Sequence, residues 1–331
     1  MKKLGTSQLR LVLIGCGGIM NLHAKNLALL KDEVKVVACV DVVKSRADEF
    51  AARFNCSSYS DPVKATSETR PDAAIIAVPP NAHVFEEELL EYGVNLFIEK
   101  PVAMDLETAQ RILRKIEKTG VINSVGYMWR YLDVVQAARK ELSDPSTIGM
   151  IYGQYVWAAN FPPGHWWLKK SASGGQIIEQ VTHTIDLIRY FAGEAETVYA
   201  KLEKRLSTDP NIDVEDSSVI MIKHRSGVVS TVVATWKSTN TMQETFVRIF
   251  GRNLVVDLVG HQRKAVFYRN NRVEDVRSVV DPYLEELKVF FQAVRLGSQE
   301  GILSPYSDAY KTLELTVKAN MSHQLGRMVE V

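Results

Sequence analysis

The chain has 331 residues, 46% of them hydrophobic, and a formal net charge of +1 at pH 7. This length suits two domains with cores of their own. The balanced charge excludes the large basic surface that binds nucleic acid or an anionic membrane.

The amino-terminal segment and the cysteines indicate in which cellular compartment the protein is expected. Met1–Arg10 is followed by a short, glycine-rich apolar stretch, so we expect neither a signal peptide nor a membrane span. Cys16, Cys39 and Cys56 are odd in number and lack C-x-x-C or zinc-ligand spacing. We therefore expect a cytoplasmic protein with reduced thiols and no metal site.

The first predicted element is a buried strand, Leu11–Ile14, that runs directly into a glycine-rich turn and then a helix. This is the context of a dinucleotide-binding motif, in which glycines let the backbone approach a pyrophosphate at the helix N-terminus. The third glycine of the G-x-G-x-x-G pattern is replaced by methionine, so a plain strand–turn–helix is the alternative. The residues expected to bind the cofactor here are Gly15, Gly17, Gly18, Ile19 and Met20.

The second predicted strand, Val34–Val40, ends at Asp41. A carboxylate at this position accepts hydrogen bonds from the ribose hydroxyls of the cofactor and repels a 2′-phosphate, which favours NAD(H) over NADP(H). Lys44 and Arg46 follow closely and could hold a phosphate, although an exposed helix start explains them as well. NAD is therefore the expected cofactor, and NADP is the alternative.

Apolar runs alternate with helical patterns up to about Ser124, which is typical of a doubly wound parallel sheet. Further strands are predicted at Ala73–Val78, Leu96–Ile98 and Val121–Val125, with helices at Ser45–Phe54, Val84–Tyr92 and Leu106–Lys118. We expect an N-terminal Rossmann domain at residues 1–125.

Two of these strands end in proline-containing turns at the carboxyl edge of the sheet, where ligands bind in open α/β folds. In the first turn, Val78–His83, an asparagine is placed to cap the next helix. In the second, Glu99–Pro101, a lysine is expected to point into the crevice where a nicotinamide would lie, and a solvated lysine is the alternative. The cofactor-binding residues expected from both turns are Val78, Pro79, Asn81, His83, Glu99 and Lys100.

The pattern changes after Tyr127: a predicted helix, Leu132–Leu142, precedes a series of β-rich runs, and two helices end the chain. The β-rich runs are Ile151–Ala158, Val198–Leu206, Ser217–His224, Val228–Trp236, Thr245–Phe250, Leu254–Leu258 and Ala265–Tyr268, and the last helices are Tyr283–Leu296 and Ser307–Leu325. We expect an α+β domain at residues 126–331 with a large, mostly antiparallel open sheet. Whether its last helices pack on the first domain is left open.

A further helix, predicted at Gln176–Phe191, carries a second group of polar residues. Glu179 and His183 are four residues apart and so share one face of a helix, which Asp186 continues. A carboxylate beside an imidazole suits acid–base chemistry, because histidine titrates near neutral pH. A polar face without a chemical role and a metal site are the alternatives.

Together these motifs resemble the Gfo/Idh/MocA oxidoreductases, a family that includes glucose–fructose oxidoreductase and inositol dehydrogenase. The resemblance rests on the glycine turn, the Val78–His83 and Glu99–Pro101 turns, Gly174-Gly175 and Glu179-x-x-x-His183-x-x-Asp186, and it runs to the helix before Gly326. It implies a Rossmann domain, a C-terminal domain whose open sheet forms homodimers or homotetramers, and hydride transfer between nicotinamide and a hydroxyl or carbonyl of a sugar or cyclitol.

The resemblance also implies roles for single residues. The expected catalytic residues are Lys100, His183 and Glu179. Lys100 matches the active-site lysine of the family and His183 its usual acid–base residue, whereas Glu179 stands where many members have aspartate, which leaves its part in proton transfer open. Arg130 lies in a segment that often lines the substrate pocket. The expected substrate-binding residues are Lys100, Arg130, Trp166, Trp167, Glu179, His183 and Asp186. The tryptophans either pack on a sugar ring or close an interface.

The expected reaction is transfer of a hydride from a secondary alcohol carbon to the nicotinamide. His183 would accept the hydroxyl proton, and Lys100 would hydrogen-bond the same oxygen. One alternative is an NAD-using lyase or glycosidase that oxidises its substrate only transiently. The other is a non-catalytic, ligand-sensing regulator on the same fold.

Overall fold

A computed structural model describes residues 8–331, so the expectation about a leader in Met1–Arg10 falls mostly outside the described residues. The helices of the described part include none that is long and apolar enough to cross a membrane. The chain divides into two compact units. Unit 1 contains the described residues up to Ala103 together with Glu107–Gly126 and Pro282–Asp308, and unit 2 contains Met104–Leu106, Tyr127–Asp281 and Ala309–Val331.

Unit 1 is built on a six-stranded sheet in the order β3-β2-β1-β4-β5-β6, and its neighbouring strands pair in parallel. The strands are β1 (Leu9–Ile14), β2 (Val34–Val40), β3 (Ser57–Tyr59), β4 (Ala73–Ile76), β5 (Asn95–Ile98) and β6 (Asn123–Val125). The strand order reverses between β1 and β4, and ligands bind at the carboxyl ends of the strands at such a switch point. The expected Rossmann fold is confirmed.

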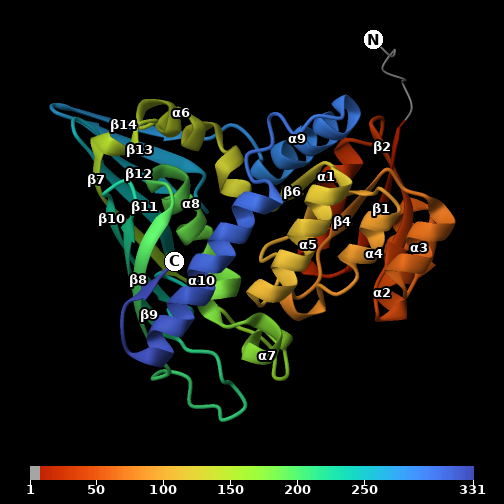
Figure 1. The fold of residues 1–331 in the computed structure, drawn as a ribbon, viewed down its shortest axis with the longest axis horizontal. Helices are drawn as coiled ribbons and strands as arrows, with labels where there is room; N and C mark the ends of the chain where they lie inside the picture. The colour runs from red at the N-terminus through yellow and green to blue at the C-terminus, as the bar shows by residue number, and fades with distance from the viewer. Residues whose placement is uncertain (1–7) are drawn as a thin grey trace. The chain divides into compact units, whose positions relative to one another are not determined.

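Helices flank the strands of this sheet (Figure 1). They are α1 (Gly18–Leu29), α2 (Lys44–Phe54), α3 (Pro62–Thr69), α4 (Glu86–Glu91), α5 (Leu106–Thr119) and α9 (Pro282–Leu296). The sequence analysis predicted neither β3 nor α3. Asp61 nevertheless marks the start of α3, because its carboxylate accepts the backbone N–H groups of Val63 and Lys64 at 2.8 and 3.2 Å.

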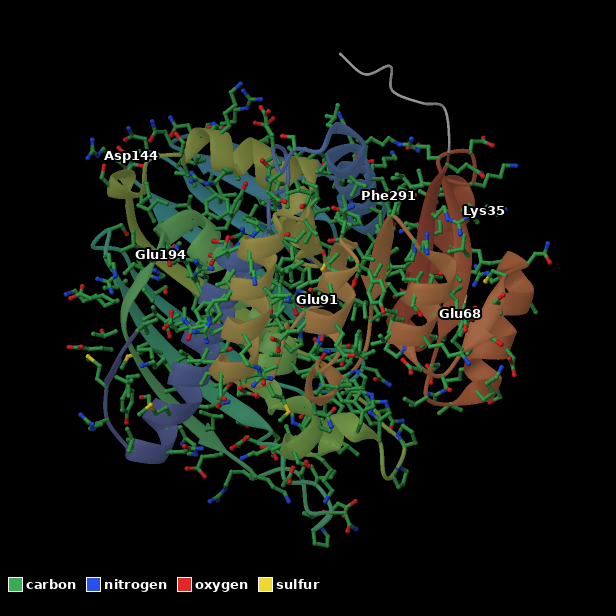
Figure 2. All side chains as sticks on the ribbon, turned by 45° about the vertical axis from the view of Figure 1, so that its right-hand side comes forward. Lys35, Glu68, Glu91, Asp144, Glu194 and Phe291 are labelled. Carbon is green, nitrogen blue, oxygen red and sulfur yellow. The ribbon has the colours of Figure 1, made fainter. Side chains whose placement is uncertain are left out.

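Helix α9 belongs to unit 1, although it lies within residues 126–331. The sequence had left open whether the last helices pack on the first domain. The buried side chains Leu287, Phe290 and Phe291 of α9 join a core cluster with Leu11 and Phe97 of the sheet. Figure 2 labels Phe291 on this helix. The sequence could not decide this point, because the apolar spacing of a helix shows that one face is buried but not which partner buries it.

Unit 2 contains a nine-stranded sheet in the order β14-β13-β12-β11-β7-β10-β9-β8-β15. Neighbouring strands pair antiparallel except β7 and β10, which are parallel, so the expected mostly antiparallel sheet is confirmed. The strands are β7 (Ile148–Val156), β8 (Ala195–Glu203), β9 (Ser217–His224), β10 (Val229–Thr235), β11 (Glu244–Gly251), β12 (Val255–Val259), β13 (Lys264–Arg269), β14 (Arg272–Arg277) and β15 (Val329–Glu330).

One face of this sheet is covered and the other is exposed. The helices of unit 2 are α6 (Asp133–Glu141), α7 (Lys170–Ser173), α8 (Thr182–Ala192) and most of α10 (Tyr306–Leu325). Helix α8 packs on β7, β10 and β11, and α6 packs on β12 and β13 (Figure 1). Along β9 buried and exposed residues alternate, with Ile220 and Ile222 in the core and Val219 and Met221 exposed.

Candidate active site

The turn after β1 fits a dinucleotide. Gly15 has φ +84°, and a Cβ there would lie 2.5 Å from the carbonyl oxygen of Ala77, so glycine is required. A Cβ on Gly17 or Gly18 would meet no atom within 4 Å. Gly17 is the N-cap of α1 and, as a glycine, has no side chain that could occupy the first N–H groups of the helix. The N-terminus of α1 is therefore open to a pyrophosphate, which its partial positive charge would attract.

Asp41 is fixed beside this turn, where the sequence analysis expected a ribose ligand. Its carboxylate accepts the backbone N–H of Cys16 at 2.8 Å through Oδ2 and that of Val43 at 2.8 Å through Oδ1. Because a carboxylate oxygen has two lone pairs, each oxygen retains acceptor capacity for a ribose hydroxyl. Ile19 and Met20 lie in the first turn of α1.

The turn after β4 contains Val78 and Pro79, both half-buried, and a 3-10 turn at Pro80–Ala82. Asn81 lies inside this turn, and the N-cap of α4 is Phe85, so the predicted capping role of Asn81 is wrong. His83 is buried, and its Nδ1 lies 2.5 Å from Oε1 of the buried Glu86. The turn thus presents an exposed asparagine and anchors a buried histidine.

The turn after β5 holds Lys100 next to a buried carboxylate. Oε1 of Glu99 lies 2.6 Å from Nε2 of His23 on α1, and a Cβ on Gly126 would lie 2.8 Å from its other oxygen. Glu286 of α9 completes a group with His23 and Glu99 whose ligand-capable atoms lie within 4.8 Å of one another. Glu99, the residue before Lys100, therefore contacts His23 of α1 and lies close to Gly126, which follows β6, and to Glu286 of α9.

Sequence reasoning missed His23 and Glu286. Both are polar residues inside apolar helical stripes, His23 beside Met20 and Ala24 and Glu286 beside Leu287. A charged or titratable residue at a core position needs a partner, because an unpaired buried charge is costly. That pattern was visible in the sequence and could have identified them.

In unit 2, Glu179 lies in a π-helical turn, Ile177–Val181, that precedes α8. The predicted helix Gln176–Phe191 is thus not a uniform α-helix, and the four-residue spacing of Glu179 and His183 spans its irregular part. Residues four apart share a face only in α-helical geometry, so the spacing alone does not place Glu179 and His183 on one face here. π-turns occur frequently at functional sites.

The carboxylate of Glu179 accepts a hydrogen bond from the indole N–H of Trp167. Trp167 is only 2% exposed and is stacked on Phe161 at 4.8 Å and edge-on to Trp236 at 5.2 Å. Because its ring is covered by protein, the contacts of Trp167 favour a role in holding Glu179 over a role in packing on a sugar. Trp166 is half-buried beside this cluster.

The imidazole of His183 is held between two aromatic rings. Trp129 lies 5.2 Å from it between ring centroids, and Tyr127 lies edge-on at 6.2 Å. The hydroxyl of Tyr127 lies 2.8 Å from that of Thr182, and burial raises the pKa of Tyr127, so the phenol stays protonated. Trp129 is packed so closely that a Cβ on Gly260 would lie 2.4 Å from its ring. The sequence analysis assigned no role to Trp129.

Arg130 and Asp186 form a buried ion pair. Nε and Nη2 of Arg130 donate to the two carboxylate oxygens of Asp186 at 2.8 and 2.6 Å, and the hydroxyl of Thr312 donates to Oδ1 at 3.0 Å. Both side chains are 3% exposed. The contacts of Asp186 therefore match an orienting role within α8.

Comparison with known proteins agrees with both units. Residues 9–127 match the model of an oxidoreductase family with an NAD-binding Rossmann fold, and residues 137–255 match the GFO/IDH/MocA C-terminal domain. The chain is 27% identical to scyllo-inositol 2-dehydrogenase (NAD(+)) of Bacillus subtilis, with 98% of the chain and 96% of the relative covered. It is 26% identical to myo-inositol 2-dehydrogenase of Thermotoga maritima, with 98% of each covered.

Solved structures share the fold. A levoglucosan dehydrogenase complexed with NADH and levoglucosan has a TM-score of 0.87 at 20% identity, covering 98% of this chain and all of that one (100%). The WlbA dehydrogenase of Bordetella pertussis, complexed with NADH and UDP-GlcNAcA, has a TM-score of 0.84 at 20% identity, with 98% and 99% covered. The chain belongs to the Gfo/Idh/MocA family of NAD-binding oxidoreductases.

Proposed function

We propose that this NAD-dependent oxidoreductase transfers a hydride between nicotinamide and a secondary hydroxyl or carbonyl of a cyclitol or sugar. The proposal rests on finding both a site that fits the cofactor and two side chains that suit proton transfer. The glycine turn and Asp41 fit a cradle for NAD, and the resemblance to the family assigns the reactive positions to Lys100 and His183. The similarity to two inositol 2-dehydrogenases along 98% of the chain supports a cyclitol.

The proposed roles follow from the chemistry of each side chain. His183 accepts the hydroxyl proton as the alcohol is oxidised, and Tyr127 and Trp129 fix the plane of its ring. Lys100 donates a hydrogen bond to the same oxygen and stabilises the negative charge that develops there. When bound, the nicotinamide supplies the redox chemistry by accepting the hydride.

Glu179 is proposed to position the substrate, because its carboxylate is already engaged by Trp167. Asp186 and Arg130 keep α8 in place through their ion pair. Glu99 is proposed to hold the strand end that carries Lys100. Trp166 and the Val78–His83 turn remain candidates for contacts with substrate and cofactor.

We further propose a cytoplasmic homodimer or homotetramer. The odd number of cysteines without metal spacing supports a reducing compartment. The exposed apolar side chains of the sheet in unit 2 support assembly of like chains through that face.

The proposal is tested by following reduced nicotinamide on mixing the protein with NAD or NADP and a panel of inositols, aldoses and glycosides. We expect NADH to accumulate with a cyclitol or sugar. His183→Ala should lower kcat by about 10²–10⁴, the range for a positioned acid–base group, and Lys100→Ala should also lower it. Lys118→Ala, which removes an exposed lysine at the end of α5, is the matched control.

Two results would favour the alternatives. Substrate conversion without release of NADH would indicate transient internal oxidation, as in an NAD-using lyase. If the protein binds the cofactor but converts no member of the panel, and if His183→Ala binds the cofactor equally well, the result would indicate a ligand-sensing regulator.

A further inference from the structure

The cysteines of unit 1 gather at the carboxyl end of β2, close to the NAD cradle. Cys39 is the sixth residue of β2, and its sulfur lies 3.6 Å from that of Cys56, which directly precedes β3. Cys16, in the glycine turn, has its sulfur 3.5 Å from the carbonyl oxygen of Val40. Cys39 and Cys56 are thus 17 positions apart in the chain, but their thiols are in contact.

The backbone fixes both members of this pair. At the end of α2, Asn55 adopts φ +50°, its N–H donates to the carbonyl of Ala52 at 3.4 Å, and that of Cys56 donates to Ala51 at 3.0 Å. This is the Schellman arrangement that ends a helix in a defined direction. On the other side, Cys39 is paired with Ser58 in the parallel ladder of β2 and β3. The fold of the backbone therefore places the two thiols next to each other.

The two cysteines differ in a way that suits stepwise oxidation. Cys39 is fully buried, whereas Cys56 is partly exposed and so accessible to a small oxidant. A hydrogen bond from Cys39 lowers the pKa of Cys56, and burial opposes this. Hydrogen bonds with Cys16 and Cys56, together with burial, raise the pKa of Cys39. Cys56 is thus the thiol that ionises first, and the thiolate is the form that reacts.

We propose that Cys39 and Cys56 are a reversible oxidation site that closes to a disulfide and weakens NAD binding. With hydrogen peroxide as oxidant, the Cys56 thiolate attacks one peroxide oxygen, the O–O bond breaks, and the other oxygen leaves as water after taking up a proton. The sulfur of Cys39 then attacks the sulfenic sulfur of Cys56. The S–O bond breaks, and its hydroxyl leaves as a second water with the thiol proton. Two thiols are oxidised and one peroxide is reduced.

The link to NAD runs through β2. The sulfurs have to approach from 3.6 Å to about 2.05 Å to form the bond. Cys39 is two residues before Asp41, whose N–H donates to the carbonyl of Tyr59 in β3 at 3.2 Å and whose carboxylate accepts the N–H of Cys16. Drawing β2 toward the start of β3 therefore shifts the carboxylate of Asp41, the proposed ligand of the ribose.

The test uses the full chain and needs no substrate. The protein is treated with hydrogen peroxide, blocked with an alkylating agent, and mapped by mass spectrometry without reduction, and NAD binding is measured before and after. We expect a peptide pair joined through Cys39 and Cys56, with the NAD dissociation constant raised about tenfold, equivalent to about 1.4 kcal/mol. A thiol reductant should restore both.

The Cys56→Ser variant should form no cross-link and should bind NAD equally with and without peroxide. The Cys16→Ser variant should still form the cross-link. If a variant does not fold, peptide mapping of the wild-type protein alone still identifies the cross-linked cysteines. Absence of any cross-link, a cross-link through Cys16, or an unchanged dissociation constant in fully oxidised protein would each overturn the proposal. None of these results depends on turnover, so they are distinct from a failure of the proposed activity.

Discussion

At the scale of single residues, Trp167 is the side chain whose role the structure changes most. Trp167→Phe keeps an aromatic ring in the cluster but removes the N–H that Glu179 accepts. A hydrogen bond to a charged group contributes about 1.5–3 kcal/mol, so kcat/KM should fall about 10- to 150-fold. The measurement is kcat and KM as a function of pH, because a displaced carboxylate alters the pH profile whereas a loss of packing alone does not.

The same cluster offers a matched control. Trp236 is also buried, and its indole N–H donates to the backbone carbonyl of Glu215 at 2.8 Å. Trp236→Phe should lower the free energy of unfolding to a similar extent but leave kcat/KM near the wild-type value. Equal losses of kcat/KM in both variants would show that the cluster matters only for stability.

Residue types and positions in the sequence were enough to identify Lys100 and His183 as candidates, because both lie in segments that carry the resemblance to the family. The surroundings of these residues were not predictable. The contact of Trp129 with His183 and the bond from Trp167 to Glu179 depend on side-chain directions and on segments distant in the chain. Sequence spacing carries no such information beyond one helix or strand.

At the scale of elements, strands with strong apolar runs and helices with clear periodicity were predicted to within a few residues, as for Val34–Val40 and Ser217–His224. The short strand β3 was missed, because three residues provide too little pattern. The π-helical turn at Ile177–Val181 was also missed. Its hydrogen-bond shift leaves the apolar residues of the segment buried, so the hydrophobic pattern looks like that of an α-helix.

His224 joins three elements and makes their stability depend on pH. Its Nδ1 lies 3.0 Å from the carbonyl of Gly193 after α8, and its Nε2 lies 2.9 Å from the hydroxyl of Ser230 in β10. Burial lowers the pKa of His224, and the nearby Arg189 acts in the same direction. The contact with the Gly193 carbonyl and the charge of Glu194, labelled in Figure 2, oppose this shift without reversing it. The imidazole is therefore neutral in the folded protein at pH values where it is already protonated in the unfolded chain.

The unfolded chain then binds more protons, so stability rises with pH in this range. The wild-type protein should lose stability as the pH falls below about 6.5, the usual pKa of histidine, and the loss should end once the folded state also binds the proton. His224→Gln should show a smaller loss over the same range. The measurement is urea unfolding at several pH values, and identical pH dependence in both proteins would contradict the prediction.

At the scale of the whole molecule, the sequence predicted two folds in the right order but not the full path of the chain. The first fold is completed only by Pro282–Asp308, after the sheet of the second has been built. In this returning segment, Ser304 pairs with Val125 at the end of β6, and its hydroxyl donates to the Val125 carbonyl at 2.6 Å. Such long-range contacts have no local pattern, and only the three-dimensional structure reveals them.

The exposed face of the nine-stranded sheet leads to a prediction about assembly. Val219, Met221, Val229 and Met328 are about half exposed, at 50%, 52%, 49% and 58%. Three of them, Met221, Val229 and Met328, line a hollow of about 300 Å³ on this face together with Met150 and Tyr199. Contiguous apolar surface of this kind marks an interaction site, and a face that pairs with its own copy gives a closed dimer.

We therefore expect the wild-type protein to sediment as a dimer or tetramer in analytical ultracentrifugation. Met221→Lys should shift it toward monomer, because a buried lysine at the centre of the interface would lack a partner charge. Leu29→Lys is the matched control: Leu29 is 70% exposed at the end of α1 in unit 1, so the same charge there should leave the assembly unchanged. A monomeric wild-type protein, or an assembly that Met221→Lys does not weaken, would show that this face binds something other than a second copy.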